Sequence, residues 1–241
     1  MNRFFILLVA SVVLVMLNGA AIAPPLNRLA MEKELAALQN QLREKERSFL
    51  DPSSQDKAQY AQLLSQPDAG IFRLLSRGGS SGKLLTVYGS GGYYSFTRMT
   101  NEYGHGNDLS LELGRFQMNN GSSSFGLISL IGDIPLETIT VDHPSVEFLK
   151  NPNNSKAATF RELRNKSPEG FRQSDFTYTR EVVAAPNTTY ILRSIDPPGS
   201  DIIVALRVIK READGSVVII WKKLKTFPAP VYERERFRFS R

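Results

Sequence analysis

The strongest constraint on the fold of this chain is a hairpin whose two strands are apolar on both faces. The expected strands, residues 201–211 and 216–225, flank Asp214-Gly215, a dipeptide typical of tight β-hairpin turns. Because successive side chains of a strand point to opposite faces, such a hairpin belongs in the middle of a sheet that is covered on both sides. The apolar residues of the two alternating sets are Val204, Leu206 and Val208 on one face and Ile203, Ala205 and Ile209 on the other.

From about residue 68 the rest of the chain also alternates between apolar and polar residues, which predicts further strands. The expected strands are 71–75, 84–88, 93–98, 109–113, 115–118, 124–130, 136–141, 176–184 and 189–196. Between 142 and 170 the pattern loosens, and Pro144 predicts the first turn of a short helix, with another helix over about 156–165. Dense, short strands joined by tight turns predict a mainly β chain, with an antiparallel β-sandwich or jelly-roll-like domain over residues 68–232.

Residues 24–67 are expected to form a helical stalk before this domain. Apolar residues recur in steps of four, three and four, the spacing of a coiled-coil seam, and Lys45 interrupts them. They are Met31, Leu35, Leu38, Leu42 and Phe49. Two interpretations remain open: an amphipathic helix or stalk, or a short coiled coil that joins copies of the chain through residues 31–49. A second helix is expected over about 55–65, after Asp51-Pro52.

The first 23 residues have the three parts of a secretory signal. Arg3 precedes an apolar run from Phe4 to Leu17, and small residues follow up to Ala23. The run Phe4 to Ala23 is also long enough to cross a bilayer if it is not cleaved. Residues 1–23 are therefore expected to be a signal peptide or a membrane anchor, and the remainder is expected to be exported.

The net positive charge lies at the C-terminal end. The whole chain carries +6, and its last twenty residues hold seven basic residues against two acidic ones. Residues 233–241 form a basic tail that contains Arg234, Arg236 and Arg238, and Phe237 and Phe239 alternate with the last arginines. This pattern suits binding to an anionic surface, although a solvated tail that only aids solubility explains it as well.

The residue content excludes several kinds of chemistry. The chain has no cysteine, so it has no disulfide, no thiolate nucleophile and no cysteine-based metal site, and it has only two histidines. No cofactor, metal site or catalytic residue is expected. One enzymatic alternative remains, a hydrolase that uses a pair of carboxylates for acid–base chemistry. The candidate carboxylates are Glu102, Asp108, Asp133, Glu137 and Asp142.

Tyr93 and Tyr94 are the candidate binding residues of the β domain. They follow the glycine-rich turn 89–92, and the alternation of a strand places one ring toward the core and one toward solvent. An exposed tyrosine beside a glycine-rich turn suits stacking against a sugar or a peptide, whereas cross-strand packing explains the pair without a ligand.

Three stretches of the sequence together resemble an uncharacterised group of exported bacterial proteins that contain a β-rich domain. They are Gly92–Phe96 with Glu102–Gly106, Gly132–Glu137 with Asp142–Pro144, and Ser194 through Trp221-Lys222. The resemblance spans about residues 70 to 230. It implies a bacterial envelope setting and no particular activity.

These observations predict an exported bacterial envelope protein that is a non-enzymatic binding or adhesion module. The alternatives are an anchored structural or assembly component and the envelope hydrolase described above. The expected location is periplasmic, extracellular or membrane-anchored and facing outward. The expected partners are a glycan, a peptide or an anionic envelope polymer, with a membrane anchor or a second copy of the chain in addition, while nucleic acid is not expected.

Overall fold

Two antiparallel sheets of seven and four strands make up most of the ordered structure, and there is little helix, so the mainly β prediction is confirmed. The computed structural model describes residues 27–79, 81–104, 106–118, 124–151, 170–197 and 199–229. The chain divides into two units, Met1–Leu42 and Arg43–Arg241, and both sheets belong to the second.

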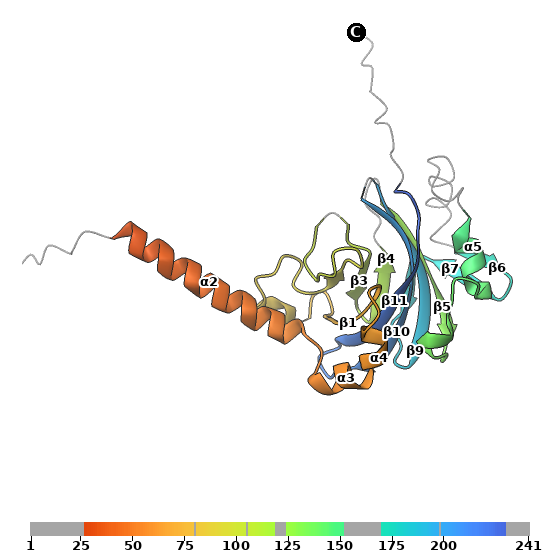
Figure 1. Cartoon of the computed structure of the whole chain (residues 1–241), viewed down its shortest axis with the longest axis horizontal. Helices are drawn as coiled ribbons and strands as arrows, with labels where there is room; N and C mark the ends of the chain where they lie inside the picture. The colour runs from red at the N-terminus through yellow and green to blue at the C-terminus, as the bar shows by residue number, and fades with distance from the viewer. Residues whose placement is uncertain are drawn as a thin grey trace, which may run out of the picture. The chain divides into compact units, whose positions relative to one another are not determined.

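The seven-stranded sheet has the order β1-β11-β10-β9-β5-β7-β6, and its long central strands lie side by side in Figure 1. All the neighbouring strands run antiparallel. The strands of this sheet are β1 (Ala69–Leu74), β5 (Phe125–Gly132), β6 (Phe171–Gln173), β7 (Phe176–Thr179), β9 (Thr188–Asp196), β10 (Ser200–Arg211) and β11 (Val217–Thr226).

The four-stranded sheet has the order β2-β3-β4-β8. Its strands are β2 (Tyr93–Tyr94), β3 (Leu109–Glu112), β4 (Arg115–Met118) and β8 (Glu181–Val183). The single strand predicted over 176–184 is therefore divided, because the chain leaves the first sheet after β7 and enters the second as β8. The break falls at Arg180, whose carbonyl oxygen accepts a hydrogen bond of 2.9 Å from the amide of Met118.

The central hairpin lies where its sequence predicts, with both faces covered. Val204 and Ile219 belong to a core cluster that also contains Leu111 and Phe116 of the four-stranded sheet. Their neighbours Ile203, Ala205 and Ile220 belong to a second cluster on the opposite face, with Leu63, Leu136 and Leu149 from helical segments. Fully burying an aliphatic side chain contributes about 1.5–3 kcal/mol, so two covered faces make this hairpin the centre of the fold.

The helices are α2 (Arg28–Leu50), α3 (Ser54–Gln59), α4 (Ala61–Leu64) and α5 (Glu147–Lys150), with 3-10 turns η1 (Ser81–Leu84), η2 (Leu136–Thr138) and η3 (Pro144–Val146). The long helix is confirmed, whereas the helix predicted over 55–65 is interrupted at Tyr60. The expected start at Pro144 is confirmed, with the His143 side chain as its N-cap. Among the helices in these ranges, none is both long and apolar enough to cross a membrane.

Besides the divided strand 176–184, three more of the predicted strands are wrong in whole or in part. In the predicted strand 84–88, Leu84 is the last residue of η1, residues 85–86 have no regular structure, and a bend at 87 leads into a turn over 88–91 in which Gly89 has a φ of 90°. Of 93–98, only Tyr93–Tyr94 pairs as a strand. Of 136–141, the first three residues form η2, because Leu136 and Ile139 are both buried three residues apart, the spacing of a 3-10 turn.

Several expected segments lie outside the described residues. These are the signal or anchor, residues 1–23, the helix over 156–165 and the basic tail, residues 233–241. They stay predictions.

Candidate functional site

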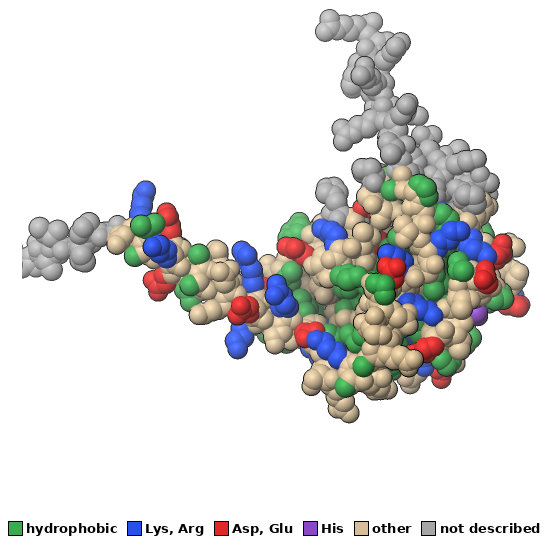
Figure 2. All heavy atoms as spheres, in the orientation of Figure 1, with side chains coloured by type: hydrophobic (Ala, Val, Ile, Leu, Met, Phe, Trp, Pro, Cys, Tyr) green, Lys and Arg blue, Asp and Glu red, His purple; other side chains and the backbone are tan. Residues whose placement is uncertain are grey.

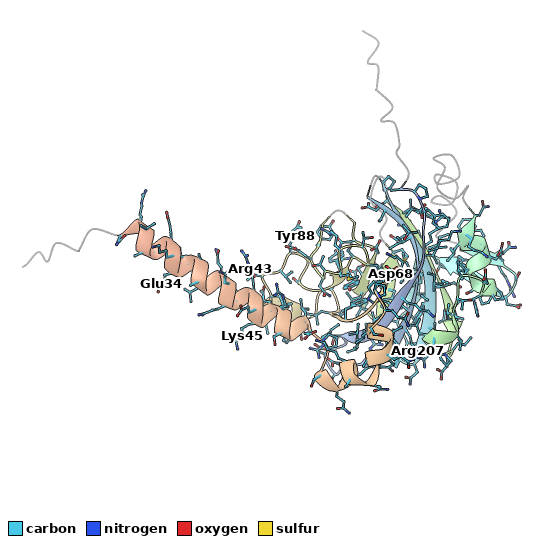
Figure 3. All side chains as sticks on the ribbon, in the orientation of Figure 1. Glu34, Arg43, Lys45, Asp68, Tyr88 and Arg207 are labelled. Carbon is cyan, nitrogen blue, oxygen red and sulfur yellow. The ribbon has the colours of Figure 1, made fainter. Side chains whose placement is uncertain are left out.

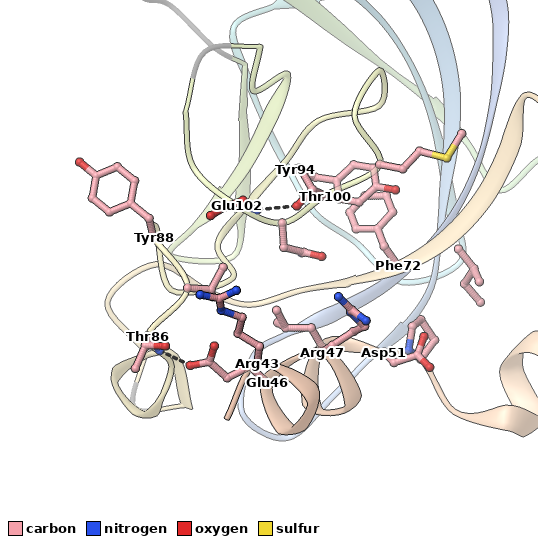
Figure 4. A pocket seen from close by; sticks show the side chains of 16 residues that line it. Arg43, Glu46, Arg47, Asp51, Phe72, Thr86, Tyr88, Tyr94, Thr100 and Glu102 are labelled. Carbon is pink, nitrogen blue, oxygen red and sulfur yellow. Dashed lines mark hydrogen bonds between the residues drawn. The ribbon is translucent and has the colours of Figure 1, made fainter. Parts of the chain in front are cut away.

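A cavity of about 560 Å³ opens within the second unit, beside β1, the edge strand of the seven-stranded sheet. Its walls are the last two turns of α2, the middle of β1 and two loops, residues 86–88 and 99–102 (Figure 4). A cavity of this size matches the lower part of the range found for small-molecule sites.

Three contacts fix the end of α2 against the rest of the unit. The buried carboxylate of Glu46 accepts a hydrogen bond from the amide of Thr86. The guanidinium of Arg73 donates to the carbonyl oxygen of Phe49 at 2.8 Å. Leu50 packs directly on Gly91, where an added Cβ would lie 2.6 Å from a Leu50 methyl group. The helical wall of the cavity is therefore tied to the β domain at three points.

Arg43 and Arg47 supply the positive charge of the cavity. They are one helical turn apart, so they share a face of α2, and Figure 4 shows both guanidinium groups extending toward the loop that carries Thr100 and Glu102. Arg43 and Lys45 leave the helix on different sides in Figure 3. Within the part of the chain that the structure describes, neither guanidinium makes an ion pair or a hydrogen bond to the protein.

Unlike the two arginines, two of the acidic residues that line the cavity have partners in the protein. Glu46 is bound to Thr86, and Asp51 forms an ion pair with Lys57 at 2.5 Å. Glu102 lines the opposite wall, and its backbone is held by Thr100 and Asn107 through hydrogen bonds of 3.2 and 3.1 Å. The ionic groups left for a ligand are thus two guanidiniums and one carboxylate.

Three tyrosines gather beside the cavity mouth. Tyr103 lies between the other two, with ring centroids 5.2 Å from Tyr88 and 4.5 Å from Tyr93. The guanidinium of Arg77 lies 4.9 Å from the centre of the Tyr93 ring. Tyr88 is common to this cluster and to the cavity lining, so the two features are continuous.

The two predicted binding tyrosines have different surroundings, as strand alternation predicts. Tyr93 is partly exposed in the tyrosine cluster, whereas Tyr94 is buried and stacks on Phe72 with the ring centroids 3.5 Å apart. Burial raises the pKa of Tyr94 far above its ordinary value, so its hydroxyl stays protonated. Sequence reasoning missed Tyr103, which a separate loop brings to the cluster, and it missed the two arginines because their helix was assigned only to the stalk.

Four of the five candidate carboxylates occupy separate surface positions. Asp133 forms an ion pair with Arg207 at 2.6 Å, and Asp142 lies 4.0 Å from Lys150. Glu137 belongs to η2, and Glu102 lines the cavity.

The fifth, Asp108, is fully buried. It accepts a hydrogen bond of 2.7 Å from the amide of Phe96 and interacts with the side chain of Ser194. Burial raises the pKa of this carboxyl to about 7, to which nearby Asp196 contributes, while these hydrogen bonds and Arg98 act in the opposite direction. Its other oxygen has no hydrogen-bond partner in the described protein. Asp108 is therefore an interior group whose protonation responds to pH.

The remaining predicted residues, Arg234, Arg236 and Arg238, lie outside the described ranges. Their role in binding stays a prediction, as does that of Tyr93 and Tyr94. Comparisons of the chain with protein-family models, curated proteins and solved structures find no match.

Proposed function

We propose that this chain is an exported bacterial envelope protein whose antiparallel β-sandwich-type domain is a non-enzymatic binding module. The ligand is anionic and occupies the cavity between α2 and the loop 99–102. The observation that carries the proposal is the pair Arg43 and Arg47, whose guanidinium groups line the cavity without an acidic partner among the described residues.

The chemistry of this pair favours an anion. A guanidinium offers a planar fork of N–H donors that matches a carboxylate or a phosphate. Two such groups one turn apart repel each other, and an anion between them removes that repulsion. Arg47 lies in the last turn of α2, where the helix dipole favours a cation, and Arg43 lies one turn before it.

The surroundings of the carboxylates favour binding over hydrolysis. Acid–base hydrolysis of a glycosidic bond uses two carboxyl groups that flank the bond on opposite sides. Asp133 and Asp142 are engaged with Arg207 and Lys150 on the surface, and Asp108 is in the interior. Glu102 is the one candidate of the five that lines the cavity.

An array of glycans, peptides and anionic polymers, incubated with the labelled full chain, tests the proposal. We expect binding to anionic members and at least a tenfold loss with the Arg43→Gln/Arg47→Gln double variant, since glutamine keeps the helix but removes the charge. Arg172→Gln, at an exposed arginine of β6, is the matched control. Unchanged binding by the double variant would place the site elsewhere and contradict the proposal.

Export needs its own test. Fusion of alkaline phosphatase to the C-terminal end of the chain in a bacterial host should give active enzyme, because this phosphatase needs disulfides that form outside the cytoplasm. Deletion of residues 1–23 should abolish that activity. Equal activity of both fusions would contradict export through this segment.

A second candidate function, self-association as a structural component, is favoured by one observation. Leu35, Leu38 and Leu42 are exposed along α2, and Figure 2 shows apolar side chains along this helix among the charged ones. Their spacing is that of a coiled-coil seam. This function is compatible with ligand binding by the β domain.

A further inference from the structure

We infer that the ligand is an acidic polysaccharide, which places an acid group on Arg43 and Arg47 and a sugar ring on Tyr88 and Tyr103. The inference rests on the proposed function and narrows its ligand to one chemical class.

The first support is the position of the tyrosine cluster. Tyr88 lines the cavity and also contacts Tyr103, so an extended ligand that leaves the cavity passes over these rings. Both rings are open to solvent, since Tyr88 is 67% exposed and Tyr103 is 43% exposed. The two rings meet edge to face, with their planes inclined by 63°. Exposed aromatic rings that adjoin a charged cavity are typical of a site rather than of a core.

The second support is that contacts within the protein fix the segments that carry the cluster. The amide of Tyr103 donates a hydrogen bond of 2.7 Å to the carbonyl oxygen of Tyr88. Both Tyr93 and Tyr103 pack on the backbone of Gly89, where an added Cβ would lie 2.5 Å from Tyr103 and 2.7 Å from Tyr93. The Tyr103 ring, held in this way, loses little conformational entropy on binding, which favours affinity for a weakly interacting ligand.

The third support is the combination of groups. A sugar ring has an apolar C–H face that packs on an aromatic ring, and hydroxyl groups that bind a carboxylate such as Glu102 or a tyrosine hydroxyl. An acidic sugar adds the carboxylate or phosphate that two guanidiniums require. An acidic peptide satisfies the arginines but offers no flat apolar face to two exposed rings, so the polysaccharide uses more of the surface.

Three polymers separate the contributions of charge and ring. Polygalacturonate carries both carboxylates and sugar rings. Its methyl ester keeps the sugar rings without the charge, and poly-L-glutamate carries carboxylates on a peptide chain without sugar rings. Alginate and hyaluronate extend the first group to other acidic sugars. Affinity for the full chain is measured by isothermal titration at constant salt, because attraction between exposed charges depends on ionic strength.

At least one acidic polysaccharide is expected to bind tenfold or more tightly than both poly-L-glutamate and the methyl ester. The Tyr88→Ala/Tyr103→Ala variant should lower that affinity at least tenfold and leave the affinity for poly-L-glutamate unchanged. The Arg43→Gln/Arg47→Gln variant should lower it to the level of the methyl ester. Leu130→Ala, at an exposed leucine of β5, is the control for loss of exposed apolar surface.

The outcomes separate this inference from the proposed function. If poly-L-glutamate binds as tightly as every acidic polysaccharide through Arg43 and Arg47, and the tyrosine variant behaves as the wild type, the inference is overturned while an anion-binding module stands. If the arginine variant binds every polymer as the wild type does, both are overturned. The circular dichroism spectrum of each variant is compared with that of the wild type, so that a loss of affinity caused by unfolding is recognised.

Discussion

Arg193 on β9 and Asp201 on β10 form a bidentate ion pair in the interior of the second unit, with both N–O distances at 2.8 Å. The remaining guanidinium nitrogen donates to the carbonyl oxygens of Leu149 and Asn151, at 2.6 and 2.8 Å, where α5 ends. The ring of Phe227 lies 4.0 Å from the same guanidinium. One arginine therefore joins the middle of the large sheet to the helical segment that covers it.

Removal of either member of this pair is expected to be strongly destabilising. The side chains of Arg193 and Asp201 are 3% and 0% exposed, so Arg193→Ala or Asp201→Ala leaves the other charge buried without its partner. We expect a loss of about 3–5 kcal/mol in the free energy of unfolding, measured by urea denaturation. Glu181→Ala, which breaks the exposed ion pair with Arg115, should lose no more than about 1 kcal/mol. Similar losses in the two experiments would contradict this account of the buried pair.

Asp108 predicts a specific dependence of stability on pH. Its pKa is about 7 in the folded protein against 3.8 for the unfolded reference, so between about pH 4 and 7 the folded state holds a proton that the unfolded state has released. This group therefore lowers the free energy of unfolding as pH rises through that range, by about 1.4 kcal/mol per pH unit, and has no further effect above it.

The Asp108→Asn variant removes this titration. Its free energy of unfolding, measured by urea denaturation at pH values from 4 to 8, should fall less steeply with pH than that of the wild type. Asp133→Asn, at an exposed carboxylate, should keep the wild-type slope between pH 5 and 7. Parallel curves for the wild type and Asp108→Asn would show that Asp108 keeps an ordinary pKa.

Gly70 on β1 lies against the indole ring of Trp221 on β11. An added Cβ at Gly70 would lie 2.7 Å from the indole nitrogen, which is too close for an unstrained contact. Gly70→Ala is therefore expected to lose about 1–3 kcal/mol in the free energy of unfolding, and the emission of Trp221 reports the shift in the denaturation midpoint. Gly104→Ala, where the nearest atom is 3.5 Å away, should be close to neutral. Equal effects of the two variants would contradict the packing argument.

If copies of the chain associate through α2, a charged residue in the apolar seam should separate them. The Leu35→Glu/Leu38→Glu variant is expected to sediment as a monomer under conditions where the full chain sediments as an oligomer, because charge in a coiled-coil seam is costly. Lys33→Glu/Asn40→Glu adds the same residue type outside the seam and should keep the wild-type mass. A monomeric wild type would contradict self-association.

The sequence predicted the ends of both strands of the central hairpin to within one residue, because two long apolar segments that flank Asp214-Gly215 leave little choice of structure. Shorter apolar stretches were ambiguous. Residues 136–141 satisfy a period of two and a period of three about equally, and burial of Leu136 and Ile139 together on one side decided for the 3-10 turn. Over 84–88, Leu84 completes η1 and a bend and a turn follow, a backbone path that the short apolar stretch did not reveal.

The candidate site was less accessible to sequence reasoning, because it is assembled from separated segments. Arg43, Phe72, Tyr88 and Glu102 come from a helix, a strand and two loops, and each is unremarkable in its own stretch. Arg193 was hidden for a related reason, since one arginine in an otherwise apolar strand reveals a buried ion pair only when Asp201 is known to lie nearby. Tertiary contacts, and not local pattern, place these groups together.

Hydrogen exchange followed by mass spectrometry, with and without saturating polygalacturonate, tests the central claim most directly. Binding in the cavity predicts slower exchange of backbone amides in the loops 86–91 and 99–104, no change in β6, and loss of this protection in the Arg43→Gln/Arg47→Gln variant. Protection confined to residues outside the walls of the cavity, or equal protection in the double variant, would contradict a binding site at Arg43 and Arg47.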